Sequence, residues 1–234
     1  MFEPSGLNRL HGTLLKNLII AIDGPSGAGK GTLARTLATR LGYLHVDTGA
    51  MYRSVAWKAA HDGLSLDDED AVAAMAERAV LEQHGGTVTI DGQDVTRAIR
   101  TPEADKAAAA VARLPRVREV LVARQRALGA NGNVVMEGRD IGTVVFPTAD
   151  MKIYLDASAE ERARRRSSDT AHTGGQDTLA NVQSELVARD KTDSTRAVAP
   201  LTLAPDAVYI DTTEMPIEVV VNHVMMLLLD KIEI

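Results

Sequence analysis

The feature that most constrains this chain is a glycine-rich segment between an apolar run and a helical pattern. Residues 18–22 are all apolar, as in a strand buried on both faces, and leucines recur every four positions over residues 30–41, as in a helix. The segment that follows the apolar run and enters the helical pattern consists of Gly24, Pro25, Ser26, Gly27, Ala28, Gly29, Lys30, Gly31 and Thr32. A strand, a glycine-rich turn and a helix in this order predict a loop that holds phosphate groups.

The residue types in this loop suit phosphate for separate physical reasons. Glycines let the backbone aim successive N–H groups into a concave nest, and the helix adds the positive end of its dipole. Lys30 supplies a mobile charge for the β- and γ-phosphates of a nucleoside triphosphate such as ATP. Gly31 stands where many such loops have a hydroxyl residue, which leaves open whether Thr32 or Ser26 contacts Mg²⁺.

Short apolar segments alternate with amphipathic ones along the rest of the chain. We expect strands at 133–136, 151–155 and 207–210, and helices at 50–60, 115–128, 159–166, 179–190 and 216–229. This alternation predicts βαβ units and a parallel sheet. Together with the phosphate loop, it predicts an α/β fold of the P-loop NTPase type, a three-layer sandwich with a central parallel sheet.

Charge is distributed unevenly, and this bears on what the chain binds. The net charge of −6 argues against a nucleic-acid polymer as partner, and the absence of cysteine excludes thiol chemistry. Residues 62–94 hold nine acidic side chains and one basic one, whereas residues 97–126 hold eight basic and three acidic. We interpret residues 64–100 as an insertion beside the main sheet, with a hairpin at 87–92, leading into a basic helical segment.

The apolar runs are too short for a membrane-spanning helix, which needs ~20 residues. The first 17 residues also lack the apolar stretch of a signal peptide. We therefore expect a cytoplasmic protein that does not bind a membrane.

Two further segments place charged residues where anions bind. Thr48 suits the N-cap of the helix that follows residues 43–46, and Arg53 lies one turn beyond its start. A helix N-terminus with an arginine forms a second anion site, although a capped helix with a surface arginine is the simpler alternative. Glu137, Arg139 and Asp140 follow a buried strand, at the end where α/β sheets bind ligands.

Arginines also gather at 162–166 and at 189–196. In an acidic protein, clustered arginines indicate phosphate binding. For residues 162–166 alone, a solvated helix face paired with Glu160 and Glu161 is an equal alternative.

These segments together resemble the bacterial cytidylate kinase family, nucleoside monophosphate (NMP) kinases that phosphorylate CMP and dCMP. The matching segments are IDGPSGAGKGT (22–32), DTGAMYR (47–53), IRTPE (99–103), PRVRE (115–119), RQRA (124–127), EGRDIGTVVFP (137–147), KIYLDAS (152–158) and RDKTDSTRAVAPL (189–201). The resemblance runs from about residue 17 to 230. Many enzymes share the phosphate loop, but the segments at 138–147 and 193–201 are far more specific.

The resemblance implies a role for each matching residue. The substrate-binding residues are Thr48, Arg53, Arg118, Arg139, Asp140, Asp193 and Arg196, and those that act on the transferring phosphoryl group are Lys30, Arg139, Arg189 and Arg196. Arg118 and Asp140 match the pair that reads cytosine. Arg162 and Arg166, on a lid helix, join the phosphate loop in binding ATP. Some members add a serine at the position of Ala109, which leaves open how strictly this chain excludes UMP.

The resemblance also implies a domain organisation and a reaction. Residues 1–17 are an N-terminal extension and 18–234 a single kinase domain, with an NMP-binding segment at about 48–128, which includes the acidic insertion, and a short helical lid at about 158–175. A monomer would transfer the γ-phosphoryl group of ATP, with Mg²⁺, to CMP or dCMP. The alternatives are another small-molecule kinase, with UMP, AMP or shikimate as acceptor, or a nucleotide-dependent switch protein.

Overall fold

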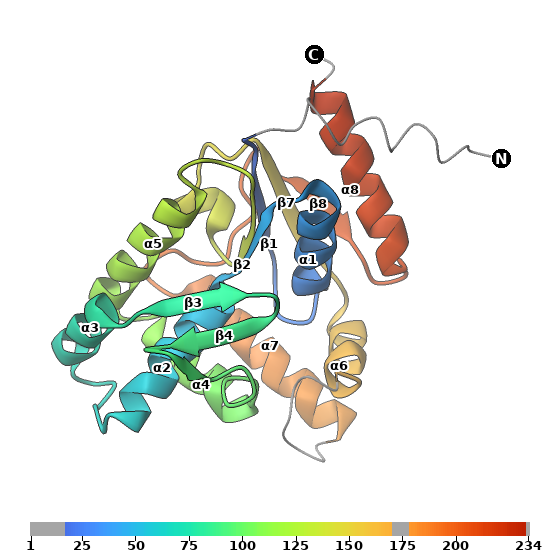
Figure 1. The fold of residues 1–234 in the computed structure, drawn as a ribbon. Coiled ribbons are helices and arrows are strands. Elements are labelled where there is room, and N and C mark those ends of the chain that lie inside the picture. Colours follow the sequence, from blue (N-terminus) through green and yellow to red (C-terminus); the bar gives the residue numbers. More distant parts are fainter. Residues whose placement is uncertain (1–16, 170–177, 233–234) are drawn as a thin grey trace.

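The structure, a computed structural model, describes residues 17–169 and 178–232 and is built around a five-stranded sheet (Figure 1). Its strands are β1 (Ile19–Asp23), β2 (Leu44–Asp47), β6 (Val134–Gly138), β7 (Met151–Asp156) and β8 (Val208–Asp211). They lie in the order β2-β6-β1-β7-β8, and every neighbouring pair is parallel. The predicted α/β class and central parallel sheet are therefore confirmed, with strand ends displaced by one or two residues.

Helices cover both faces of this sheet and complete three layers. The pair α1 (Lys30–Leu41) and α8 (Ile217–Ile232) covers one face, and α2 (Thr48–His61) and α5 (Pro115–Gly129) cover the other (Figure 1). Successive side chains of a strand point to opposite faces. Thus Ile20 and Ile22 pack with α1 and α8, while Ala21 packs with the α2 side. Burial on both faces explains why the strands are apolar runs rather than alternating patterns.

The acidic insertion forms a small second sheet and a helix on the α2 side, and its buried side chains share the hydrophobic core of α2. It consists of α3 (Glu69–Arg78) and three antiparallel strands, β3 (Leu81–His84), β4 (Thr87–Ile90) and β5 (Gln93–Asp94), followed by α4 (Pro102–Val111). The predicted hairpin is confirmed as β4–β5. Asp91 (φ 51°) and Gly92 (φ 77°) both adopt the left-handed conformation that a two-residue hairpin turn favours.

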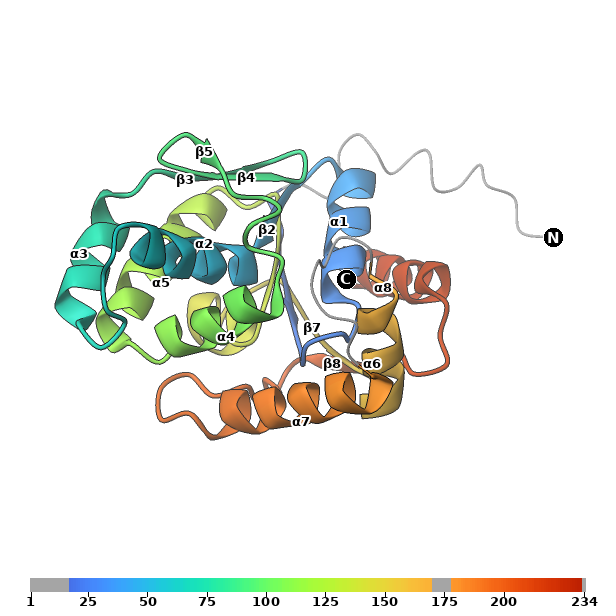
Figure 2. The same ribbon diagram turned by 90° about the horizontal axis from the view of Figure 1, so that it is seen from below.

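Two helices near the C-terminal part of the chain lie against each other. These are α6 (Ala159–Ser167) and α7 (Leu179–Thr195), and α7 runs along the side of the molecule that carries α4 (Figure 2). Helix α7 continues five residues beyond its predicted end. Residues 1–16 of the predicted extension and 170–175 of the predicted lid lie outside the described residues. Within the described ranges, the chain has no helix long and apolar enough to cross a membrane.

Candidate active site

The predicted phosphate loop lies between the end of β1 and the start of α1. Gly24, Gly27 and Gly29 have φ angles of 143°, 81° and 97°, which side chains rarely allow. A Cβ on Gly24 would stand 2.0 Å from the carbonyl oxygen of Leu155 in β7. Gly24 is therefore required by both backbone conformation and space, whereas Gly29 is required by its conformation alone, because the nearest atom to an added Cβ would be 3.7 Å away.

Lys30 begins α1 and bends back over this loop. Its Nζ donates a hydrogen bond to the carbonyl oxygen of Pro25 at 2.7 Å, and the residue is only 7% exposed. Burial, followed by the nearby charge of Arg139, lowers the pKa of Lys30 to about 7. An anion in the loop would stabilise the protonated lysine and raise this pKa again.

Asp23, at the end of β1, fixes the segment that follows β6. Its two carboxylate oxygens accept hydrogen bonds from the backbone N–H groups of Ile141 (2.8 Å) and Gly142 (2.7 Å), in the π-helical turn η2 (Ile141–Val145). Burial raises the pKa of Asp23 to about 6. These bonds orient the preceding residues, Arg139 and Asp140. The sequence analysis identified neither Asp23 nor the π-helical turn.

Asp140 lies between two arginines from distant parts of the chain. Arg118 on α5 donates to one carboxylate oxygen, and Arg196 at the end of α7 lies 3.6 Å from the other. The Arg118 and Asp140 side chains are 4% and 8% exposed. The guanidinium of Arg118 also lies 5.8 Å from the ring centre of Tyr52, within range of a cation–π interaction.

Arg139 and Thr48 connect this region with α7 and α2. Arg139 Nε donates to Asp193 on α7 at 2.8 Å, and the Thr48 hydroxyl donates to the carbonyl oxygen of Glu137 at 2.7 Å. The expectation that Thr48 caps α2 is wrong. Asp47 is the N-cap, because its carboxylate accepts from Ala50 N–H at 2.8 Å, which leaves the Thr48 hydroxyl available to β6.

A second cluster of arginines surrounds Asp105 on α4. Its carboxylate accepts a hydrogen bond from Arg166 and lies 3.2 Å from Arg189 Nη1 and 3.5 Å from Arg53 Nη1. Arg166 thus lies beside the predicted acceptor-phosphate residue Arg53. Sequence reasoning missed Asp105. Its burial and its partners come from residues far away along the chain, so the local sequence carries no signal for this role.

Two other arginines of α6 contact the phosphate loop directly. Arg162 Nη1 donates to the Ser26 carbonyl oxygen at 3.2 Å and to Asp190 at 2.6 Å. Arg165, which the sequence analysis did not single out, lies 3.4 Å from the Ala28 carbonyl oxygen and donates to Thr212. The solvated-helix alternative applies to Arg164, which is paired locally with Glu161 and 66% exposed, but not to Arg162.

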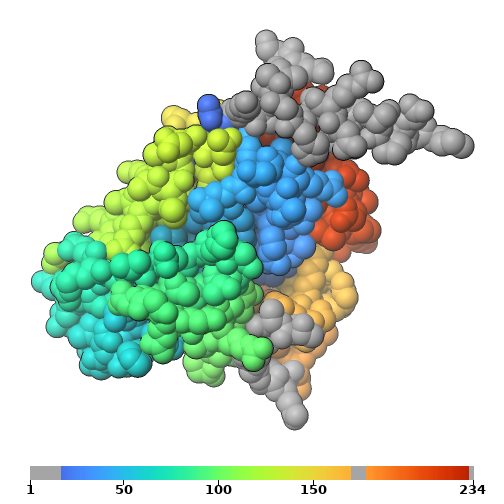
Figure 3. Space-filling view, in the orientation of Figure 1, coloured from blue at the N-terminus to red at the C-terminus, as the bar shows by residue number. Residues whose placement is uncertain are grey.

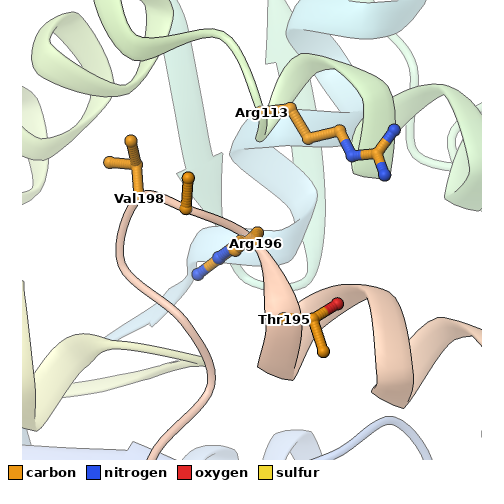
Figure 4. A pocket seen from close by; sticks show the side chains of 5 residues that line it. Arg113, Thr195, Arg196 and Val198 are labelled. Carbon is orange, nitrogen blue, oxygen red and sulfur yellow. The ribbon is translucent and has the colours of Figure 1, made fainter.

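Several of these arginines retain buried N–H groups that no described residue accepts. They are Nε of Arg53, Nε of Arg189 and Nη2 of Arg196. Buried donors almost always have a partner, so these groups are available to oxygen acceptors of a ligand or of water. Arg196 also lines a pocket beside the end of α7, across from Arg113 (Figure 4).

Oxygen-bearing side chains next to the loop fit a hard cation such as Mg²⁺. Thr32 is exposed on the first turn of α1, whereas Ser26 is buried. A carboxylate oxygen of Glu137 lies 3.0 Å from where a Cβ on Gly31 would be. The accessible hydroxyl is therefore that of Thr32, and Glu137 lies close to the neighbouring Gly31.

The charged residues predicted from sequence thus come from both sides of one region. In the space-filling view, the insertion and α4 (cyan to green) and the α6–α7 part (gold to orange) lie side by side below α1 (Figure 3). A family model described as cytidylate kinase matches residues 20–229.

The chain belongs to the cytidylate kinase family. It is 49% identical to a cytidylate kinase from Desulfitobacterium hafniense (strain Y51), over 93% of this chain and 95% of that protein. It is 47% identical to one from Geobacillus sp. (strain WCH70), over 92% and 98% respectively. Membership of this family makes the chain an enzyme, a nucleoside monophosphate kinase.

Among solved structures, a shikimate kinase from Acinetobacter baumannii aligns over 96% of this chain and 97% of that chain. The identity is 17% and the TM-score 0.47. Similarity at this level does not bear on the acceptor.

Proposed function

We propose that this cytidylate kinase family member transfers the γ-phosphoryl group of ATP to CMP and dCMP, giving CDP or dCDP and ADP. The observation that carries the proposal is the buried pair of Arg118 and Asp140, beside arginines with unused donors. The cytidylate kinases to which the chain is nearly half identical support it.

The pair suits the edge of cytosine. A carboxylate accepts from the cytosine amino group, and a guanidinium donates to the ring nitrogen and the carbonyl oxygen. Uracil has a carbonyl oxygen in place of the amino group. This oxygen and the Asp140 carboxylate are both hydrogen-bond acceptors, so neither can donate to the other. A buried polar group left in this way without a partner is costly, which favours CMP over UMP.

The cationic residues divide between donor and acceptor. Lys30, the loop N–H groups and Arg162 would hold the triphosphate, since they converge at the start of α1. Arg53, Arg139, Arg189 and Arg196 would hold the acceptor phosphate and the transferring group, with Asp193 near the sugar.

The chemistry requires positioning and charge neutralisation more than covalent participation by the protein. The acceptor phosphate has a second pKa of roughly 6, so it is mostly ionised at neutral pH and needs no general base. Bound Mg²⁺ would neutralise charge on the β- and γ-phosphates, and Thr32 and Glu137 are the side chains that would hold it. The arginines would neutralise charge that develops on the transferring group.

The test is ADP formation from ATP and Mg²⁺ with a panel of acceptors: CMP, dCMP, UMP, AMP, shikimate and none. We expect rapid ADP formation with CMP and dCMP and little with the others. Equal rates with CMP and UMP would contradict the base-recognition assignment. ADP formation that does not depend on an acceptor would instead indicate a nucleotide-hydrolysing switch.

A further inference from the structure

The carboxylate of Asp105 contacts three arginines from three different helices. Arg166 of α6 donates to it, Arg189 of α7 lies 3.2 Å away, and Arg53 of α2 lies 3.5 Å away. Asp105 itself is on α4 and is buried. The contacts therefore join α4 to α2, α6 and α7, and Figure 2 shows α7 running alongside α4.

One carboxylate does not neutralise three guanidinium groups. Arg53 is also paired with Asp47 at 3.0 Å, yet the Nε groups of Arg53 and Arg189 still have no acceptor among the described residues. A phosphate carries nearly two negative charges and three acceptor oxygens, so it satisfies such a cluster better than a carboxylate does. Asp105 thus occupies a place for which a phosphate is better suited.

We propose that Asp105 is a positioning residue that acts as a resident anion in the acceptor-phosphate site. It holds the three arginines together while the site is empty, and it competes with any phosphate that enters. The inference rests on the proposed function, because it takes the acceptor to be a nucleoside monophosphate.

The competition would keep the site free of inorganic phosphate while no nucleotide is bound. Inorganic phosphate has only its charge with which to displace the carboxylate. A nucleoside monophosphate also gains the contacts of its base with Arg118 and Asp140, and this additional binding energy offsets the displacement. Because the displacement cost is the same for both, Asp105 would lower the affinities for free phosphate and for CMP by similar factors, but only CMP would retain enough binding energy to occupy the site.

A purely structural role, as a link between α4 and α7, is the rival explanation. The chain provides a matched control for it. Lys106 and Glu185 form a second ion pair between the same two helices at 2.9 Å, with side chains 70% and 48% exposed. Glu185→Gln removes one negative charge and one α4–α7 contact, as Asp105→Asn does, but leaves the arginine cluster unchanged.

The experiment titrates inorganic phosphate into native protein, Asp105→Asn and Glu185→Gln by calorimetry. The phosphate loop is kept saturated with a non-hydrolysable ATP analogue and Mg²⁺. The titration therefore measures phosphate binding at the acceptor-phosphate site alone. We expect Asp105→Asn to bind phosphate about fivefold more tightly or better, because a negative charge has been removed within 4 Å of the site. Glu185→Gln should bind phosphate as the native protein does. Unchanged or weaker binding by Asp105→Asn would overturn the proposal.

A second readout uses phosphate as an inhibitor competitive with CMP. In Asp105→Asn, the inhibition constant of phosphate and the KM for CMP should fall by similar factors, whereas a loss of structure would raise both. If Asp105→Asn does not fold, Asp105→Ser is measured in its place, with the same expected result. The calorimetric titration needs no turnover. A native protein that fails to phosphorylate CMP would therefore refute the proposed function without deciding the role of Asp105.

Discussion

The guanidinium of Arg118 donates to the carboxylate of Asp140, and the two side chains are 4% and 8% exposed. A contrasting pair lies nearby, because Arg116, two positions before Arg118 on α5, pairs with Asp70, and those side chains are 53% and 77% exposed. An exposed pair contributes little to stability, whereas removing one partner of a buried pair leaves a charge without compensation. We therefore expect the loss of the buried pair to affect stability and function, and the exposed pair serves as a control for surface charge.

Asp140→Ala should lower the ratio of kcat/KM for CMP to that for UMP by far more than it changes the KM for ATP. It should also lower the free energy of unfolding by about 3–5 kcal/mol. Denaturant unfolding and steady-state kinetics measure the two effects. Asp70→Ala is the control, with an expected cost of at most about 1 kcal/mol and no change in the ratio. An unchanged CMP preference in Asp140→Ala would contradict the assignment of this pair to the base.

Lys30→Ala should lower kcat by about a hundredfold or more, because it removes the positive charge that would stabilise the transferring phosphoryl group. The variant should remain folded, since Lys30 makes one hydrogen bond to Pro25 and its charged form is disfavoured by burial. Lys231→Ala removes an exposed lysine far from the loop and should keep native kinetics. Native-like turnover by Lys30→Ala, with an unchanged circular dichroism spectrum, would refute the prediction that this loop binds the phosphates of ATP.

Binding of ATP should take up a proton between pH 7 and 9. The free protein holds the Lys30 pKa at about 7, below its ordinary 10.5, and a bound triphosphate restores the charged form. Between pH 7 and 10.5 the unfolded chain binds more protons than the ligand-free native state, so Lys30 makes stability rise with pH there. Calorimetry in buffers of different ionisation enthalpy measures the uptake at pH 8. A Lys30→Met variant should lack it, and equal uptake by both proteins would contradict the assignment.

Asp23→Ala should lower the free energy of unfolding by about 2–6 kcal/mol, because it leaves the buried N–H groups of Ile141 and Gly142 without an acceptor. The native Asp23 has a pKa raised to about 6 from 3.8, so this group makes stability fall as pH rises from 3.8 to 6. That part of the pH dependence should be absent in the variant. Stability profiles of both proteins over this range check the prediction, and coincident profiles would contradict it.

Most of the central sheet could be predicted, because its strands are apolar on both faces and alternate with helices of clear period. The small sheet was harder. Its turn at Asp91 and Gly92 has strong local chemistry, but β3 reads Leu-Glu-Gln-His and has no apolar pattern to identify it. Its pairing with β4 does have a local signal that the sequence analysis did not use, because Gly85 and Gly86 form a two-residue turn with φ angles of 58° and 89°.

The site shows the same division. Lys30 and the glycines have a local signature, because their function depends on consecutive residues. The role of Asp105 depends on arginines 52, 61 and 84 residues away along the chain, positions 53, 166 and 189, and no local pattern encodes that contact. Asp23 likewise binds a turn whose π-helical form has no sequence signature that we could use.

The most direct test of the central claim is the stoichiometry of products from CMP, ATP and Mg²⁺, followed by phosphorus NMR. The account predicts CDP and ADP in equal amounts, with almost no free phosphate, because the protein directs the phosphoryl group to the nucleotide and not to water. ADP with an equal amount of free phosphate, and no CDP, would contradict it.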